Sequence, residues 1–214
     1  GFTYLKDRLG LDPSHELILS VLDTGVAVLD RTATRLITVR GDTEQSVALP
    51  LRGPGALPAR TVGSDVPVTV VDNHRVYVVT GDKVAEFVVP GDSPRLQPCT
   101  AWSGRFYCPD DASGTIYILD TTGKLVSTVA VPNNGVPLEL EVREERLFIN
   151  APGSANARVV DDHHKVKVVN KYVNDVAGGD PPPVVVPPTP PTPPQGPPGA
   201  PTEVRATAGN AQAR

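Results

Sequence analysis

The sequence lacks the features that mark membrane-spanning, nucleic-acid-binding and common hydrolytic proteins. No apolar run approaches the roughly 20 residues of a transmembrane helix, so we expect no membrane insertion within this segment. The formal net charge of −4 argues against a general affinity for nucleic acid or for anionic membranes. Neither a Gly-Lys-Ser/Thr phosphate loop nor a Gly-x-Ser-x-Gly nucleophile motif occurs. With 39% hydrophobic and 5% aromatic residues, the composition is that of an ordinary soluble β-protein.

An initiator methionine is also lacking, because the chain begins with Gly1. No basic and apolar signal segment precedes the expected fold. We therefore expect an N-terminal piece to be missing, and the lack of a signal segment says nothing about export.

Proline, in contrast, is abundant and unevenly placed. The chain has 24 prolines, and residues 181–201 hold 12 of them. Most positions in this run lack an N–H group and have a fixed φ, so neither a helix nor a sheet ladder can form. We predict a disordered or polyproline II linker at residues 173–200 that acts as a semi-rigid spacer. Recognition by a proline-binding module is the alternative.

Residues 99–131 contain the clearest structural unit. Ser103-Gly104 is a two-residue turn between alternating runs, which predicts a hairpin. Two more strands follow, after an Asp-Asp-Ala-Ser-Gly loop and a Thr-Thr-Gly turn. The expected strands are residues 100–102, 105–107, 115–119 and 125–131. Four short antiparallel strands in chain order form a meander of the kind found in a β-propeller blade.

Degraded copies of this unit precede it. We expect strands in the first copy at residues 16–22, 26–30 and 35–40, with a short candidate at 46–51. This blade is expected to lack at least one strand, and residues 52–59 to form a Pro/Gly-rich loop. In the second copy we expect strands at residues 68–71, 75–80 and 83–89. Pro67 would lie immediately before the first of these, where it removes no donor from the ladder.

The return arm of the hairpin recurs along the chain. The tripeptides that begin at Arg75, Arg105 and Arg146 resemble one another. Between the last two units the register is kept at an offset of 41 residues. Three residue pairs show this offset: Arg105 and Arg146, Asp120 and Asp161, and Lys124 and Lys165. A four-stranded repeat of this period predicts an all-β fold, a partial β-propeller of about three and a half blades. A β-sandwich is the alternative.

The region around Asp120 resembles a known repeat. In residues 113–129 a strand ending in Asp120 is followed by a Gly123-Lys124 turn and an apolar strand, and this pattern is similar to the YVTN-type β-propeller repeat. The resemblance covers residues 16–172 and is strong in one unit. It implies architecture more than chemistry, because the group includes lactonase-like enzymes and many surface proteins of no known activity. No Trp-Asp dipeptide is present.

Residues 201–214 resemble the opening of a fibronectin type III domain. Pro201 precedes a run with alternating apolar residues, Val204 and Ala206, and a Gly-Asn turn follows. Fourteen residues cannot bury a core, so we expect this truncated start to be disordered or to pair loosely with another segment. The chain is thus divided into a propeller-like repeat region at 1–172, the linker at 173–200 and the truncated domain start at 201–214.

The two cysteines are the most informative candidates for chemistry. If Ser103-Gly104 is the turn, Cys99 faces Cys108 across the hairpin in a non-hydrogen-bonded pair. Such a pair has Cα atoms about 4.5 Å apart and side chains on one face, which suits a disulfide. The bridge would hold the hairpin register and implies an oxidising compartment. Two unlinked core cysteines are the alternative.

The run Asp161-Asp162-His163-His164 combines carboxylate and imidazole groups, which both bind metals. Adjacent residues on a strand or tight turn point apart, however, and no third cluster would supply the missing ligands. The aligned unit has a turn at this place. We therefore interpret the run as a turn and assign no metal site.

Two charged clusters could be functional sites, but each also has a simpler interpretation as a solvated surface. Lys165, Lys167 and Lys171 could form an anion-binding stripe, but lysines are more often the solvated face of an outer strand, where they also discourage edge pairing. The glutamates around Arg143 could form an acid/base pair only if one were buried. These glutamates are Glu141, Glu144 and Glu145. We assign no catalytic or cofactor-binding residue, expect no cofactor, and leave the binding residues unknown.

Two function hypotheses follow. The first is a non-catalytic cell-surface or secreted modular protein, whose propeller is a binding, adhesion or scaffold head for a protein or polysaccharide ligand. Its proline-spaced organisation resembles exported actinobacterial proteins, so we expect it in the extracellular space or cell envelope. The alternative is a lactonase-like propeller enzyme, or an accessory part of a secreted carbohydrate-active enzyme, because bacterial fibronectin type III modules often accompany glycoside hydrolases.

Overall fold

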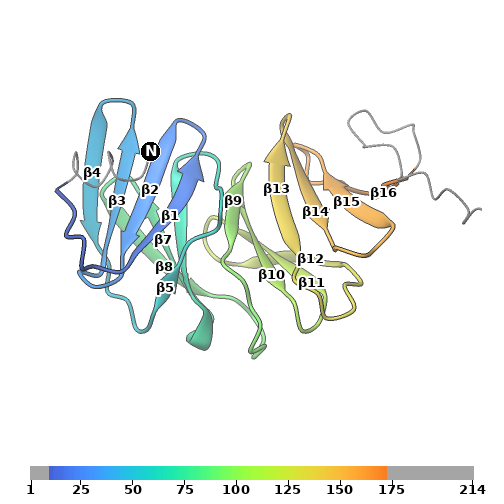
Figure 1. Cartoon of the computed structure of the whole chain (residues 1–214). Helices are drawn as coiled ribbons and strands as arrows, with labels where there is room; N and C mark the ends of the chain where they lie inside the picture. The colour runs from blue at the N-terminus through green and yellow to red at the C-terminus, as the bar shows by residue number, and fades with distance from the viewer. Residues whose placement is uncertain (1–9, 173–214) are drawn as a thin grey trace, which may run out of the picture. The chain divides into compact units, whose positions relative to one another are not determined.

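The computed structural model describes residues 10–172, and they form an all-β fold of four antiparallel sheets (Figure 1). Blade I contains β1 (Leu17–Leu22), β2 (Gly25–Asp30), β3 (Arg35–Arg40) and β4 (Thr43–Ala48). Blade II contains β5 (Gly55–Ala56), β6 (Asp65–Val70), β7 (Arg75–Thr80) and β8 (Lys83–Val88). Blade III contains β9 (Thr100–Trp102), β10 (Arg105–Asp110), β11 (Thr115–Asp120) and β12 (Leu125–Ala130). Blade IV contains β13 (Glu139–Arg143), β14 (Arg146–Asn150), β15 (Asn156–Val160) and β16 (Val166–Asn170).

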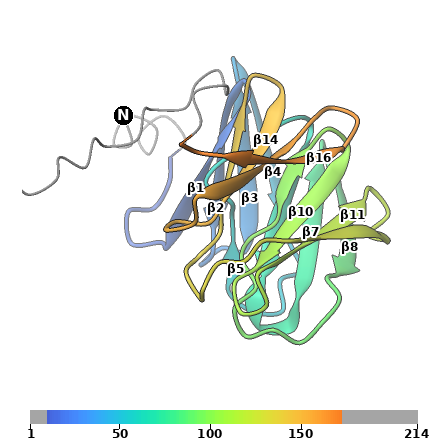
Figure 2. The same cartoon turned by 90° about the vertical axis from the view of Figure 1, so that its right-hand side faces the viewer.

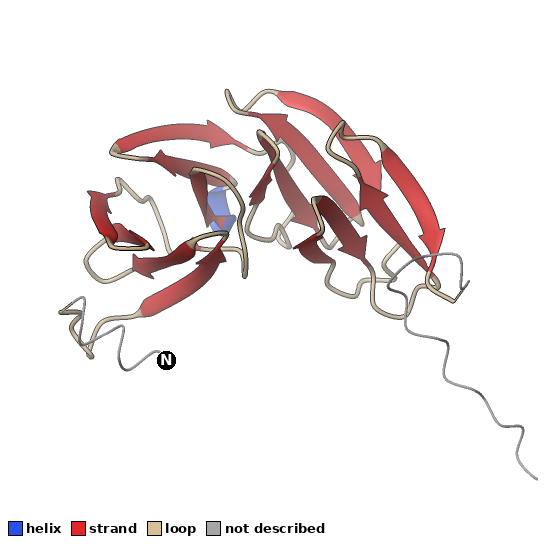
Figure 3. Ribbon diagram, turned by 90° about the horizontal axis from the view of Figure 1, so that it is seen from above, coloured by secondary structure: helices blue, strands red, loops and turns tan. Residues whose placement is uncertain are grey.

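The four blades have the propeller arrangement that the repeat predicted. In every blade the strands pair in chain order, so each sheet is a simple meander. Seen from above, successive meanders stand face to face along the chain, and the 3₁₀ turn η1 (Val71–Asn73) joins β6 to β7 (Figure 3). The prediction of an all-β propeller is therefore confirmed, and the β-sandwich alternative is wrong.

The repeat is more regular than the sequence suggested. The second strands of the four blades begin at Gly25, Asp65, Arg105 and Arg146, which are 40 or 41 residues apart. The predicted match of Arg75 to Arg105 is therefore wrong. Arg75 opens the third strand of blade II, whereas Arg105 opens the second strand of blade III. The two strands share an arginine and an aromatic residue but hold different places in their sheets.

Two sequence-based expectations about strands need correction. Blade I is complete, because residues 43–48 form a fourth strand that pairs along its whole length with β3. The Pro/Gly-rich loop at residues 52–59 contains β5, the first strand of blade II, which pairs with Val70 and Thr69 alone. Gly55 is needed there, since a Cβ atom would lie 2.9 Å from Val68 and 3.1 Å from Leu29.

Pro67 lies inside β6 and not before it. It is opposite Val78 on β7, while the two-residue β5 does not extend to it on the other side. Pro67 has no N–H group to donate, but no carbonyl of a neighbouring strand depends on that donor, so the sheet loses no hydrogen bond. The short β5 and the internal proline are compatible for this reason.

The hydrophobic core consists of layers between neighbouring blades. Side chains alternate between the two faces of each strand, so one face of blade II packs on blade I and the other on blade III. Tyr77 and Val79 belong to the first layer, and Val76 and Val78 to the second. Each large side chain that is fully buried contributes about 1.5–3 kcal/mol, so the layers between blades are a major source of stability.

A short segment before β6 ties together the first strands of blades I and III. The N–H of Val21 on β1 donates to the carbonyl of Ala59 at 2.9 Å, and the N–H of Thr61 donates back to Val21 at 3.0 Å. One residue further, the N–H of Val62 donates to the carbonyl of Ala101 on β9 at 3.1 Å. The inner edges of both blades are thus satisfied by backbone groups of blade II.

Figure 2 looks from the side of β16, the outermost strand of blade IV. In the described part of the chain no helix is long and apolar enough to cross a membrane. The predicted linker at 173–200 and the domain start at 201–214 lie outside the described residues.

Candidate functional site

The hairpin of blade III has the register that the sequence predicted. Ser103 and Gly104 both have positive φ, at 49° and 71°, as a two-residue turn that matches the twist of the strands requires. Beyond the ladder pairs, Cys99 and Cys108 form a disulfide, with Cα atoms 4.1 Å apart. The predicted disulfide is therefore confirmed.

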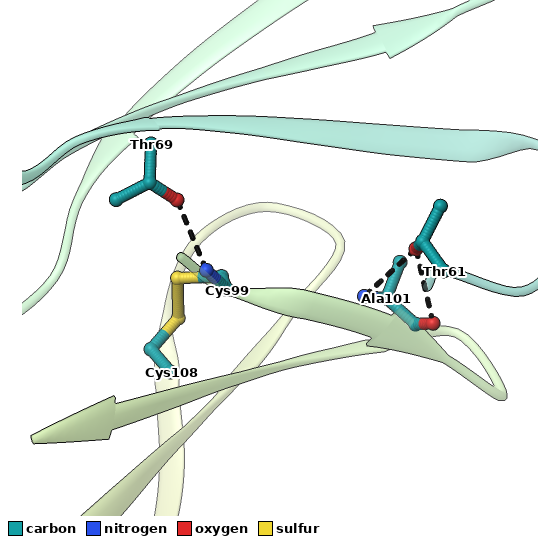
Figure 4. The surroundings of a disulfide bond; sticks show 5 residues. All are labelled: Thr61, Thr69, Cys99, Ala101 and Cys108. Carbon is teal, nitrogen blue, oxygen red and sulfur yellow. Dashed lines mark hydrogen bonds between the residues drawn. A yellow bond between two sulfur atoms is a disulfide. The ribbon is translucent and has the colours of Figure 1, made fainter. Parts of the chain in front are cut away.

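The disulfide lies in the layer between blades II and III (Figure 4). Hydroxyl groups of blade II cover the open edge of β9: the N–H of Cys99 donates to Thr69 Oγ1 at 3.0 Å. The N–H of Ala101 donates to Thr61 Oγ1 at 3.1 Å. Both cysteines are fully buried. This disulfide is a structural link and not a redox-active pair, which would need an accessible sulfur.

The Asp161-Asp162-His163-His164 run is the turn that the sequence predicted. The carboxylate of Asp161 accepts hydrogen bonds from the N–H groups of His163 at 3.0 Å and Lys165 at 2.9 Å. Asp120 accepts the equivalent bonds from Thr122 and Lys124 in blade III. Within residues 10–172 no three His, Cys, Asp or Glu side chains are grouped as metal ligands.

His164 connects the turn of blade IV to blade III. It has a positive φ of 60° and holds the place that Gly123 holds one blade earlier. Its ring meets Trp102 edge-on, with centroids 5.9 Å apart, and its Nδ1 lies 2.8 Å from the hydroxyl of Tyr107. Burial raises the pKa of Tyr107 to about 12, so the phenol keeps its proton and donates a hydrogen bond to Nδ1 of a neutral His164.

The pKa of His164 is lowered by burial and by the Arg105 guanidinium, against the opposing effect of Asp161. The unfolded chain therefore takes up the proton first as the pH falls. The stability that neutral His164 provides is present above the unfolded pKa, about 6.5, and is lost as the pH falls through the folded value.

We predict that acidification from about pH 8 to about pH 5.5 lowers the urea midpoint of unfolding of the wild type more than that of His164→Asn. Asparagine accepts positive φ and does not titrate, so this variant isolates the imidazole. Urea titrations followed by tryptophan fluorescence at both pH values measure the difference, because Trp102 is the one tryptophan of the chain. Equal pH dependence in the two proteins would contradict the prediction.

The charged clusters on blade IV are solvated. Lys165 and Lys167 are exposed on or beside the outermost strand, and Lys171 Nζ donates to the carbonyl of Ala151 at 3.0 Å. Glu141 forms an exposed ion pair with Arg143 at 2.7 Å. Glu144 and Glu145 form the turn between β13 and β14, with φ of 48° and 57°. Lys171 is half-buried, and the other residues have the environment of a solvated surface, which was the simpler interpretation.

Buried carboxylates at the ends of second strands were not predicted. Asp30 is fully buried at the end of β2 and accepts hydrogen bonds from the Ala33 N–H and from His15 Nδ1, each at 2.8 Å. Burial alone would raise the pKa of Asp30, but these bonds and the Arg35 guanidinium hold it below its usual value. Asp110, two repeats later, accepts bonds from the Ala112 N–H and the Ser113 hydroxyl. An aspartate recurs at the end of the second strand in blades I and III, and this recurrence is the sequence pattern from which these buried carboxylates could have been predicted.

Asp111 organises the neighbouring connections. Its carboxylate accepts a hydrogen bond from Gln97 Nε2 at 2.7 Å and another from the Leu138 N–H at 2.8 Å. Its backbone carbonyl accepts a bond from Asn133 Nδ2 at 2.9 Å, and Arg95 donates to the carbonyl of Gly135 at 2.8 Å. We call the surface formed by residues 93–97, 110–114 and 132–138 the Asp111 rim.

The Asp111 rim joins three segments that are separate in the sequence. The connections from blade II to blade III and from blade III to blade IV meet there at the β10–β11 turn. Asp111 is 5% exposed and Asn133 is 7% exposed, so these groups fix the loops and leave the outer side chains to solvent. The exposed residues include Arg95, Asn134 and Val136. Such an arrangement can present a rigid binding surface.

Comparison with known proteins agrees with the fold. No protein-family model and no curated protein matches the sequence. Among solved structures, a streptogramin B lyase is similar at 13% identity and a TM-score of 0.56, over 75% of this chain and 56% of that chain. Virginiamycin B lyase from Staphylococcus aureus is similar at 12% identity and a TM-score of 0.55, over 75% and 57%. AztD from Citrobacter koseri is similar at 14% identity and a TM-score of 0.50, over 72% and 46%.

The chain spans about half the length of these structures. At such low identities the similarity shows the β-propeller fold alone.

Proposed function

We propose that residues 1–172 form the non-catalytic binding head of a cell-surface or secreted modular protein, and that its Asp111 rim binds a protein or polysaccharide. In this proposal the blades are of the YVTN type. They are joined through the spacer at 173–200 to a fibronectin type III start at 201–214. The confirmed disulfide supports an extracellular or cell-envelope location, because disulfides persist in oxidising compartments.

The observation that supports binding over catalysis is how the buried carboxylates at or just after the ends of second strands are used. In Asp30, Asp110 and Asp111 the oxygens accept hydrogen bonds that fix turns and connections. A general acid or base needs a proton that can move to or from a substrate, whereas these groups are buried and fully engaged in the structure. Rigid loops with exposed side chains lower the entropy cost of binding a partner.

A matched pair of valine variants tests this proposal. Val136 is 37% exposed on the Asp111 rim, and Val126 is 46% exposed on the outer strand β12. We expect the full chain to bind at least one member of a panel of purified glucans, mannans, arabinogalactans and extracellular proteins in surface plasmon resonance. Val136→Asp should weaken this binding about tenfold or more, because it places a desolvated charge in the contact, while Val126→Asp should not.

Three results would contradict the proposal. These are binding to no member of the panel, equal binding by both variants, and turnover of lactones or polysaccharides by the wild type. The last would favour the alternative of a propeller enzyme or of an accessory part of one. Turnover that disappears in Asp161→Ala, His163→Ala or His164→Ala would also reopen the metal interpretation of that turn.

A further inference from the structure

A hollow of about 220 Å³ lies between blades I and II, at the ends of the strands opposite to the Asp111 rim. Blade I supplies side chains from β3 and β4, and blade II supplies the start of β6, the end of β7 and the turn that follows. The lining residues are Thr38, Arg40, Thr43, Gln45, Ser64, Val66, Val79 and Gly81.

The turn between the third and fourth strands differs in length from blade to blade. In blade III the connection between the third and fourth strands reaches blade II, where Gly123 lies against Phe87. In blade IV the same connection reaches blade III, where His164 packs on Tyr107. Blade II has the two-residue turn Gly81-Asp82 at this place, between β7 and β8. Blade II thus has only a short turn beside the hollow, which Gly81 lines.

The walls of the hollow are polar and its floor is apolar. Thr38, Thr43 and Gln45 supply hydroxyl and amide groups to these walls. Val66 and Val79 pair across β6 and β7 and are 1% and 3% exposed. They form an apolar surface at the back of the hollow.

Arg40 is held in place at one side. Its Nη1 donates to Asp23 at 2.6 Å, and its Nη2 donates to the carbonyl of Gly63 at 2.6 Å. The guanidinium is thus positioned before any ligand arrives, and the Asp23 carboxylate already neutralises its charge. A free anion would gain little here, whereas a neutral group that accepts a hydrogen bond from a remaining N–H would gain more.

We propose that this hollow binds one neutral sugar residue, as a second site apart from the Asp111 rim. Sugar hydroxyls both donate and accept, which matches the hydroxyl and amide groups of Thr38, Thr43 and Gln45. The C–H face of a pyranose ring can cover Val66 and Val79. The volume is below the roughly 300–1,000 Å³ of drug-sized pockets, which suits a single ring. The absence of a carboxylate among the lining residues leaves no partner for a cationic ligand.

Titration of the full chain with neutral and charged probes tests the site. The neutral probes are glucose, galactose and mannose, and the charged ones are glucuronate and inorganic sulfate. We expect a neutral hexose to shift the NMR signals of Thr38, Gln45, Val66 and Val79 in a saturable way. Ser64→Phe, which fills the hollow, should abolish these shifts. Ser46→Phe is the matched control, because Ser46 pairs with Ile37 on the opposite face of blade I.

A milder variant keeps the test decisive if Ser64→Phe fails to fold. Thr38→Val keeps the shape of the side chain and removes its hydroxyl, so it should weaken sugar binding while the spectrum remains that of the folded protein. The proposal is wrong if no neutral hexose produces saturable shifts, if Ser64→Phe binds as well as Ser46→Phe, or if sulfate or glucuronate binds and the hexoses do not. Binding of polymers to the Asp111 rim would be unaffected by any of these results.

Discussion

Reduction of the Cys99–Cys108 disulfide is expected to lower the free energy of unfolding by about 2–3 kcal/mol. The two cysteines are nine positions apart, and a closed loop of this size restricts the unfolded chain by about that amount on the loop-entropy view. Both are fully buried in the layer between blades II and III, and the N–H of Cys99 also bonds to Thr69. The link therefore holds β9, a strand of three residues, in the register that this layer requires.

Urea unfolding with and without a reducing agent measures this effect. Reduction leaves both sulfur atoms in the core, so it separates the loss of the cross-link from the loss of packing. The double variant Cys99→Ala/Cys108→Ala is the control, since the reducing agent should not change its stability. An unchanged wild-type midpoint after complete reduction, verified by thiol counting, would show that the cross-link contributes nothing.

Replacing Gly123 with alanine is expected to cost about 2–4 kcal/mol, which is a second large effect. Gly123 has a φ of 81°, and a Cβ atom there would lie 2.3 Å from Cβ and 2.5 Å from Cγ of Phe87. Phe87 cannot easily move, because it is 9% exposed and packs against Phe106 with ring centroids 5.3 Å apart. The substitution should therefore push the turn of blade III away from blade II.

Gly104→Ala is a matched control for the part of this destabilisation that comes from placing alanine at a positive φ. It has a φ of 71°, and nothing lies within 4 Å of the Cβ that alanine would add. Gly104→Ala should therefore cost about 1 kcal/mol, from the left-handed conformation alone. Thermal or urea unfolding of both variants gives the difference. Equal losses for the two glycines would mean that the contact with Phe87 is not a rigid part of the joint.

Local patterns predicted local structure well in this chain. The Ser103-Gly104 turn, the opposition of Cys99 and Cys108 and the turn at Asp161 all depend on residues close together in the sequence, and each is confirmed. The offset of 41 residues between the last two blades is also found in their strands. These features follow from turn geometry and strand alternation, which need no knowledge of distant contacts.

Predictions failed where packing overrides a local pattern. The strand β5 has two residues and lies in a Pro/Gly-rich stretch, yet Gly55 lets it fit closely against Val68 and Leu29. The match of Arg75 to Arg105 compared strands with different places in their sheets. Tyr77 packs toward blade I, whereas Tyr107 packs toward blade IV. The direction of each side chain depends on the place of its strand in the stack of blades.

The amino-acid sequence by itself determined the all-β class, the four-stranded repeat and the disulfide, because alternation, turn residues and short-range pairing encode them. The tertiary structure decided how separate segments combine into surfaces. The Asp111 rim brings together three segments through a buried carboxylate and its hydrogen bonds. The hollow beside Arg40 combines side chains of blades I and II. Both depend on contacts between residues far apart in the chain, which no local pattern specifies.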